Sequence, residues 1–138
     1  MAKSPRVFTL NVRVLHNRVK LHMTRNMRDA AMLLKDKIKT KISVGQPTAF
    51  IGGKLRGLNP SVSPEPPKVV TGALRGSIVH TVSREGGEIV GRIGSDSIPY
   101  ARRLEMGFHG VDGKQARPYL RSSLAENRAE ILRILVKP

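Results

Sequence analysis

The side chains that most often catalyse reactions or bind metals are few in this chain and widely spaced. The four histidines are His16, His22, His80 and His109; no two are four residues apart, and the chain has no cysteine. A transition-metal site needs several such ligands at defined spacings, so we expect no metal and no cofactor. The chain is therefore predicted not to be an enzyme.

The acidic residues and the one glycine-rich segment give no active site either. Glu126 and Glu130 stand four residues apart on a predicted helix that also carries arginines, a pattern typical of a solvated face. The segment Gly52-Gly53-Lys54 lacks the Gly-x4-Gly-Lys-Ser/Thr pattern of a phosphate-binding loop, and no strand is predicted before it.

Basic residues carry the strongest functional signal. The 138-residue chain has 25 lysines and arginines against 10 acidic residues, and its first 44 residues hold 11 of these cations but only Asp29 and Asp36. This bias implies a polyanionic neighbour, either nucleic acid or an acidic protein surface. Aromatic residues are scarce, which disfavours a binder that stacks single-stranded bases. No helix-turn-helix, zinc-finger or RNA-binding pattern accompanies the charge, which disfavours sequence-specific DNA recognition.

The hydrophobic periodicity predicts an N-terminal strand followed by a long helix. Apolar and polar residues alternate from Arg6 to Leu15, as in a half-buried strand. From about Asn17 to Ile42, apolar residues recur at three- and four-residue steps, which predicts an amphipathic helix of about 25 residues. Six basic residues lie mostly off the apolar stripe and form the predicted face for a polyanion or an acidic partner: Arg18, Arg25, Arg28, Lys35, Lys39 and Lys41.

Residues 46–68 show no period and are rich in glycine and proline, so we expect an extended loop or arm. A simple linker would be polar, whereas this segment contains scattered apolar residues. They either fold back on the core or reach a neighbouring subunit. The candidates for such contacts are Phe50, Ile51, Leu55 and Leu58.

The second half of the chain predicts short strands and helices. After a helical turn from Thr71, the strands Ser77 to Ser83 and Glu88 to Gly94 flank Gly86-Gly87, a hairpin signal. Two further helices are expected, from Ile98 to Met106 and from Pro118 to Val136. Residues 1–138 are therefore expected to form a single α+β domain, in which a small antiparallel sheet is packed by a long N-terminal helix and a C-terminal helix.

Apolar runs are all shorter than the roughly 20 residues that span a bilayer. The N-terminus also lacks the apolar core of a signal peptide. We therefore expect a cytosolic chain without a membrane partner.

Three motifs in the second half resemble the neck or tail-completion proteins of tailed bacteriophages, the gene-ten-product group of lambdoid siphophages. They are Thr71-Gly72-Ala73-Leu74-Arg75-Gly76-Ser77-Ile78, then Tyr100-Ala101 with Glu105-Met106-Gly107, then Ala116-Arg117-Pro118-Tyr119-Leu120. The motif residues are Thr71, Gly72, Leu74, Ser77, Tyr100, Glu105, Gly107, Arg117, Pro118 and Tyr119. The chain departs from the family at Phe108, where a small hydroxyl residue is common, and at Tyr119, where Phe is usual. Residues 46–68 match nothing in the family.

The resemblance implies a structural virion protein of the head–tail interface, located in the virion neck and assembled in the host bacterial cytoplasm. It implies a homo-oligomeric ring around the DNA channel, of six or twelve subunits. The ring would join the head connector or stopper to the tail terminator or tube proteins, and double-stranded DNA would pass through it non-specifically. Glu105 and Arg117 are expected to form a salt bridge, either within a subunit or across a subunit boundary.

The composition also allows other functions. The first alternative is a basic nucleic-acid-binding accessory protein, which would bind DNA or RNA tightly and in a salt-sensitive manner. A toxin-like or regulatory interaction module is a third hypothesis, and it rests on size and charge alone.

Overall fold

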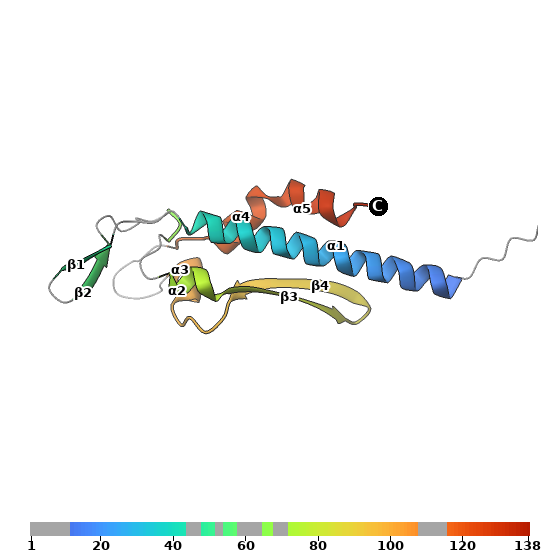
Figure 1. Ribbon diagram of the computed structural model, residues 1–138, viewed down its shortest axis with the longest axis horizontal. Helices are drawn as coiled ribbons and strands as arrows, with labels where there is room; N and C mark the ends of the chain where they lie inside the picture. Colours follow the sequence, from blue (N-terminus) through green and yellow to red (C-terminus); the bar gives the residue numbers. More distant parts are fainter. Residues whose placement is uncertain (1–11, 44–47, 52–53, 58–64, 68–71, 108–115) are drawn as a thin grey trace, which may run out of the picture.

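The computed structural model describes residues 12–43, 48–51, 54–57, 65–67, 72–107 and 116–138. The elements are α1 (Val12–Lys41), β1 (Thr48–Ile51), β2 (Lys54–Gly57), α2 (Ala73–Ser77), β3 (Ile78–Glu85), β4 (Glu88–Ser95), α3 (Ala101–Met106), α4 (Leu120–Glu126) and α5 (Arg128–Leu135). Helix α1 runs along most of the molecule, with the β3–β4 hairpin on one side and α4 and α5 on the other (Figure 1). The expected α+β class, with its small antiparallel sheet, is confirmed. The C-terminal helices pack mainly on α1 rather than over the sheet.

Helix α1 begins earlier than the periodicity predicted. Residues 12–15 form its first turn, so the expected strand from Arg6 to Leu15 is wrong over these four residues, and its remainder lies outside the described residues. Val12, Leu15 and Val19 also stand at three- and four-residue steps, which a helix uses equally well. A helix satisfies its backbone hydrogen bonds internally, whereas a strand needs a neighbouring strand.

The β3–β4 hairpin forms as the sequence predicts, with its turn at Gly86 and Gly87, where φ is 56° and 88°. Positive φ at both turn positions matches the two-residue turn that favours Gly-Gly. The hairpin approaches α1 closely at Gly91, where an added Cβ would lie 2.9 Å from the Met27 sulfur. The absence of a side chain at this position therefore sets the distance between hairpin and helix.

The core lies at the C-terminal end of α1. Its buried members are Leu34, Ile38 and Ile42 of α1, Ile78 of β3 and Tyr119 just before α4. Further apolar side chains from the surrounding elements pack around these five: Leu74, Ile93, Leu104, Leu120 and Ile131. The predicted apolar stripe of α1 is thus buried in its second half, whereas Val19 and Met23 in the first half are exposed.

The expected C-terminal helix from Pro118 to Val136 is two shorter helices, α4 and α5. They meet at Asn127, which has φ −104° and ψ 11°. The Asn127 side-chain amide donates to the carbonyl of Ser123 at 2.8 Å, a local bond that competes with continued helix. The end of α5 is held to α1 by buried Asn26, whose amide donates to the carbonyl of Lys137 at 2.8 Å.

Two smaller differences concern the remaining elements. Helix α3 begins at Ala101 rather than at Ile98, since Pro99 and Tyr100 form a turn. Within residues 46–68, β1 and β2 pair in antiparallel register from Thr48–Gly57 to Ile51–Lys54. The dipeptide Gly52-Gly53 is typical of a hairpin, but the flanking residues lack hydrophobic alternation, so the sequence analysis did not predict these strands.

No helix among the described residues is long and apolar enough to cross a membrane.

Candidate partner-binding face of helix α1

All three sequence motifs contribute residues to one apolar cluster, and the second and third motifs meet at the junction between α3 and α4, where Glu105 is the central residue. Its side chain is buried, and its carboxylate accepts hydrogen bonds from the backbone N–H groups of Tyr119 (2.8 Å), Leu120 (2.9 Å) and Arg121 (3.0 Å). The Arg121 guanidinium adds a bond to the carboxylate at 3.1 Å and another to the Glu105 carbonyl at 3.0 Å. Glu105 therefore supplies acceptors to the N–H groups that begin α4.

The electrostatics of this junction favour an ionised Glu105. Burial alone would raise the pKa of Glu105, but the N–H groups of Leu120, Arg121 and Tyr119 together with the Arg121 side chain lower it. Burial and the nearby Glu105 charge raise the pKa of Tyr119 to about 12. Within the chain, Glu105 forms an ion pair with Arg121, four residues beyond Arg117, and the backbone N–H of Arg117 donates to the Leu104 carbonyl at 2.7 Å. A pairing of Glu105 with Arg117 across a subunit boundary stays a prediction.

The other motif residues mainly shape the backbone around the same core. Gly72 has φ 79° and precedes α2, where its carbonyl accepts a hydrogen bond from Gly76 at 2.8 Å. Ser77 bonds the Leu74 carbonyl at 2.7 Å and the Ser95 hydroxyl at 2.5 Å, which ties α2 to β4. The remaining motif residues are placed as follows: Leu74 and Pro118 are half-buried, Tyr119 is fully buried, Gly107 ends α3, Tyr100 is exposed, and Thr71 lies outside the described residues.

Five of the six predicted basic residues lie along one side of α1. Arg18, Arg25, Arg28, Lys35 and Lys39 follow one another at steps of seven, three, seven and four residues, which keeps them on one helix face. The three arginines are exposed and the two lysines are half-buried. None of the five belongs to the core cluster, and the face borders the β3–β4 hairpin, since Arg25 and Arg28 line a pocket together with Val82, Ser83 and Arg84.

Lys41 belongs to a different surface. Its ammonium bonds Glu126 at 2.6 Å and the Ser122 hydroxyl at 2.9 Å, both on α4. This ion pair links α1 to α4 within the subunit, which removes Lys41 from the predicted partner face. Lys37 makes a similar link to Glu130 of α5 at 3.4 Å.

Exposed apolar side chains interrupt the basic residues of this face. Val14, Leu21 and Met32 fit the same spacing, so that the face repeats at alternating four- and three-residue steps. Leu21 is 62% exposed, and Met32 and Val14 are nearly half exposed. We call this row the α1 seam; its members are Val14, Arg18, Leu21, Arg25, Arg28, Met32, Lys35 and Lys39.

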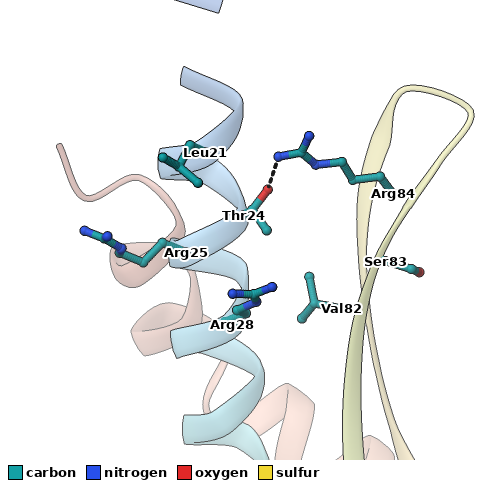
Figure 2. A pocket seen from close by; sticks show the side chains of 7 residues that line it. All are labelled: Leu21, Thr24, Arg25, Arg28, Val82, Ser83 and Arg84. Carbon is teal, nitrogen blue, oxygen red and sulfur yellow. Dashed lines mark hydrogen bonds between the residues drawn. The ribbon is translucent and has the colours of Figure 1, made fainter. Parts of the chain in front are cut away.

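A pocket of about 330 Å³ opens between the seam and the β3–β4 hairpin. It is lined by Leu21, Thr24, Arg25, Arg28, Val82, Ser83 and Arg84, none of which is acidic. Arg84 reaches across from β3 and donates to the Thr24 hydroxyl at 3.1 Å, while Arg28 and Val82 lie on facing walls (Figure 2). The pocket therefore combines guanidinium groups with an apolar surface.

Arg84 is the functional candidate that the sequence reasoning missed. It follows Ile78, His80 and Val82 at two-residue steps along β3, so it lies on their face of the strand, and its bond to Thr24 shows that this face meets α1. The predicted strand ended at Ser83; extended by one residue, its alternation places Arg84 on the same face as Ile78 and Val82, but it does not say which element packs on that face. On the other side of the hairpin, Arg92 forms an ion pair with Glu85. Hydrogen bonds from Arg92 and Ser83 to the Glu85 carboxylate lower the pKa of Glu85 to about 2.

The predicted contacts of residues 46–68 cannot be placed on this site. Phe50 and Ile51 belong to β1 and Leu55 belongs to β2, but the surroundings of their side chains and the whole of Leu58 lie outside the described residues.

Comparisons with protein-family models, curated proteins and solved structures find no significant match to this chain.

Proposed function

We propose that this chain is a structural virion protein of the head–tail interface of a tailed bacteriophage. In this proposal it forms a homo-oligomeric ring around the DNA channel and joins the head connector to the tail. It acts by binding neighbouring proteins and performs no catalysis, while double-stranded DNA passes through the ring without being recognised.

The observation that carries the proposal is the convergence of the three motifs on one structural unit. Motif residues that are more than 40 positions apart, such as Leu74 and Tyr119, pack in the same apolar cluster, and the backbone N–H of Tyr119 also donates to Glu105. A chance resemblance would scatter its residues over the fold. Because the three motifs contribute to one apolar cluster, we infer that the resemblance reflects a fold shared with the neck and tail-completion proteins.

Exposed apolar surface gives this subunit the means to assemble. Besides the α1 seam, a hollow of about 490 Å³ lies between α1 and the hairpin turn and is lined by apolar Val19, Met23 and Ile89 among other residues. Val19 and Met23 are about half exposed. Exposed apolar side chains gathered at one hollow favour protein–protein contact, as a ring of identical subunits requires.

The second candidate function is a basic nucleic-acid-binding accessory protein. The exposed arginines Arg18, Arg25 and Arg28 favour it, since they could neutralise phosphates without reading the bases. The exposed apolar residues between them argue for a protein partner instead, because apolar side chains gain nothing from a phosphate backbone.

Electron microscopy of a lysate from the virus lacking this gene tests the proposal. We expect complete but separate heads and tails, or DNA-filled heads without tails, and complementation with the intact gene should restore joined particles. Intact and infectious virions would refute the head–tail function and leave nucleic-acid binding as the hypothesis to test on the purified protein.

A further inference from the structure

We propose that the pocket between α1 and β3 binds an acidic, partly apolar peptide segment of a partner protein. Arg28 and Arg84 would bind carboxylates, and Leu21 and Val82 would contact an apolar side chain placed between them. This inference does not depend on the proposed assembly function, which would only determine where in the virus particle the partner protein lies.

Charge complementarity identifies the sign of the partner. Arg25, Arg28 and Arg84 line the pocket, and none of the described residues that line it is acidic. Arg84 is positioned by its hydrogen bond to Thr24, which uses one terminal nitrogen, Nη2, and leaves the planar group near the pocket (Figure 2). Guanidinium groups bind carboxylates through paired hydrogen bonds of fixed geometry.

The apolar wall distinguishes a peptide from nucleic acid. Leu21 is 62% exposed and lies on the seam beside Arg25 and Arg28. Val82 faces Arg28 from the hairpin (Figure 2). A phosphate backbone would leave these side chains in water, whereas a peptide with acidic and apolar residues would bury them. The seam extends the same mixture along α1, because Val14 and Met32 alternate with Arg18 and Lys35 at the spacing of a helix-binding surface.

Binding of synthetic probes to the full chain tests this proposal. The first probe is a short fluorescent peptide rich in Glu and Asp with interspersed leucines, the second replaces its leucines with serines, and the third is a short duplex DNA. At about 0.15 M salt, where attraction between exposed charges more than about 8 Å apart is largely screened, we expect the leucine-containing peptide to bind most tightly. Tighter binding of the duplex, or equal binding of the two peptides, would overturn the proposal.

Single substitutions with matched charge changes locate the site. Arg28→Gln and Arg84→Gln should each weaken binding of the leucine-containing peptide by about tenfold, the effect of losing one strong charge-assisted contact. Arg102→Gln and Arg128→Gln remove the same charge from exposed positions on α3 and α5 and should leave binding unchanged. Equal losses in all four variants would show attraction to net charge alone and would refute a built site.

Folding and virus assembly are separate readouts. The circular dichroism spectra of all four variants should show the same helix content as that of the unchanged protein. Arg28→Gln changes the pocket without removing the hydrogen bond between Arg84 and Thr24. A failure of peptide binding would refute the pocket proposal while heads and tails still depended on the gene. Normal virions from the deletion would refute the assembly function while the peptide result stood.

Discussion

The Glu105 carboxylate and Arg121 form a two-sided link between α3 and α4. Glu105 accepts both the backbone N–H of Arg121 at 3.0 Å and its guanidinium Nε at 3.1 Å, and the Arg121 guanidinium returns to the Glu105 carbonyl at 3.0 Å. Glu105 is buried, whereas the Arg121 side chain is 63% exposed. The buried carboxylate is therefore the partner on which the junction depends.

Glu105→Ala should strongly destabilise the fold. It leaves the N–H groups of Tyr119, Leu120 and Arg121 without their acceptor, and we expect a loss of about 3 kcal/mol in the free energy of unfolding. Arg121→Ala removes an exposed guanidinium with its two hydrogen bonds to Glu105 but leaves the three backbone N–H bonds in place, and it should cost about 1 kcal/mol. Urea unfolding followed by circular dichroism measures both variants, and equal losses would contradict the capping role assigned to Glu105.

The lowered pKa of Glu105 should make stability depend on acid pH. The folded state holds this carboxyl ionised below its ordinary pKa of 4.5, so the unfolded chain binds more protons there. The stabilisation is present above pH 4.5 and is lost as the pH falls through the lowered pKa. Glu105→Gln should flatten this part of the profile of unfolding free energy against pH. Glu85→Gln is the control, because Glu85 has its own pKa near 2 and should leave the Glu105 contribution in place.

Gly107 and Gly76 should respond to alanine in opposite directions. Gly107 ends α3 with φ 83°, and an added Cβ would lie 3.0 Å from the backbone nitrogen of Ala116. Strain and crowding together predict that Gly107→Ala lowers the free energy of unfolding by about 2 kcal/mol. Gly76 lies within α2 with no atom near its Cβ position. Gly76→Ala should raise that free energy by about 0.5 kcal/mol, since alanine favours helix. Thermal or urea unfolding of the two variants checks the signs, and a stabilising Gly107→Ala would contradict the described end of α3.

Tyr119 should contribute through its ring far more than through its hydroxyl. Its side chain has no exposed surface, and its hydroxyl lies at 3.4 Å from the Ala101 carbonyl, a long hydrogen bond. Tyr119→Phe should therefore cost less than about 1 kcal/mol. Tyr119→Ala empties the centre of the core and should cost about 4 kcal/mol. A large loss in the phenylalanine variant, measured by urea unfolding, would mean that the hydroxyl contact is stronger than its length indicates.

These residues also show what the sequence could and could not predict. Local patterns sufficed for the hairpin, because Gly86-Gly87 between two apolar runs specifies its own turn. The Glu105–Arg121 pair and the pocket at Arg84 depend on which elements pack together, and no local pattern encodes that. The prediction of where α1 begins was wrong for a related reason. The four residues from Val12 fit both a strand and a helix, and they are helical because the helix that follows continues through them.

Reversing three charges on the α1 seam should abolish head–tail joining without unfolding the subunit. Arg25 and Arg28 are exposed and Lys35 is half-buried, and none of the three belongs to the core, so replacing all three by Glu should preserve the circular dichroism spectrum. The same change should repel an acidic partner, because each like-charge contact replaces an attraction. The matched control converts Arg102, Arg128 and Arg133, exposed on α3 and α5, to Glu with the same change in net charge. We expect the seam variant to yield separate heads and tails and the control to yield infectious particles. An undiminished yield from the seam variant would remove this face from the joint, and equal losses from both variants would trace the defect to total charge.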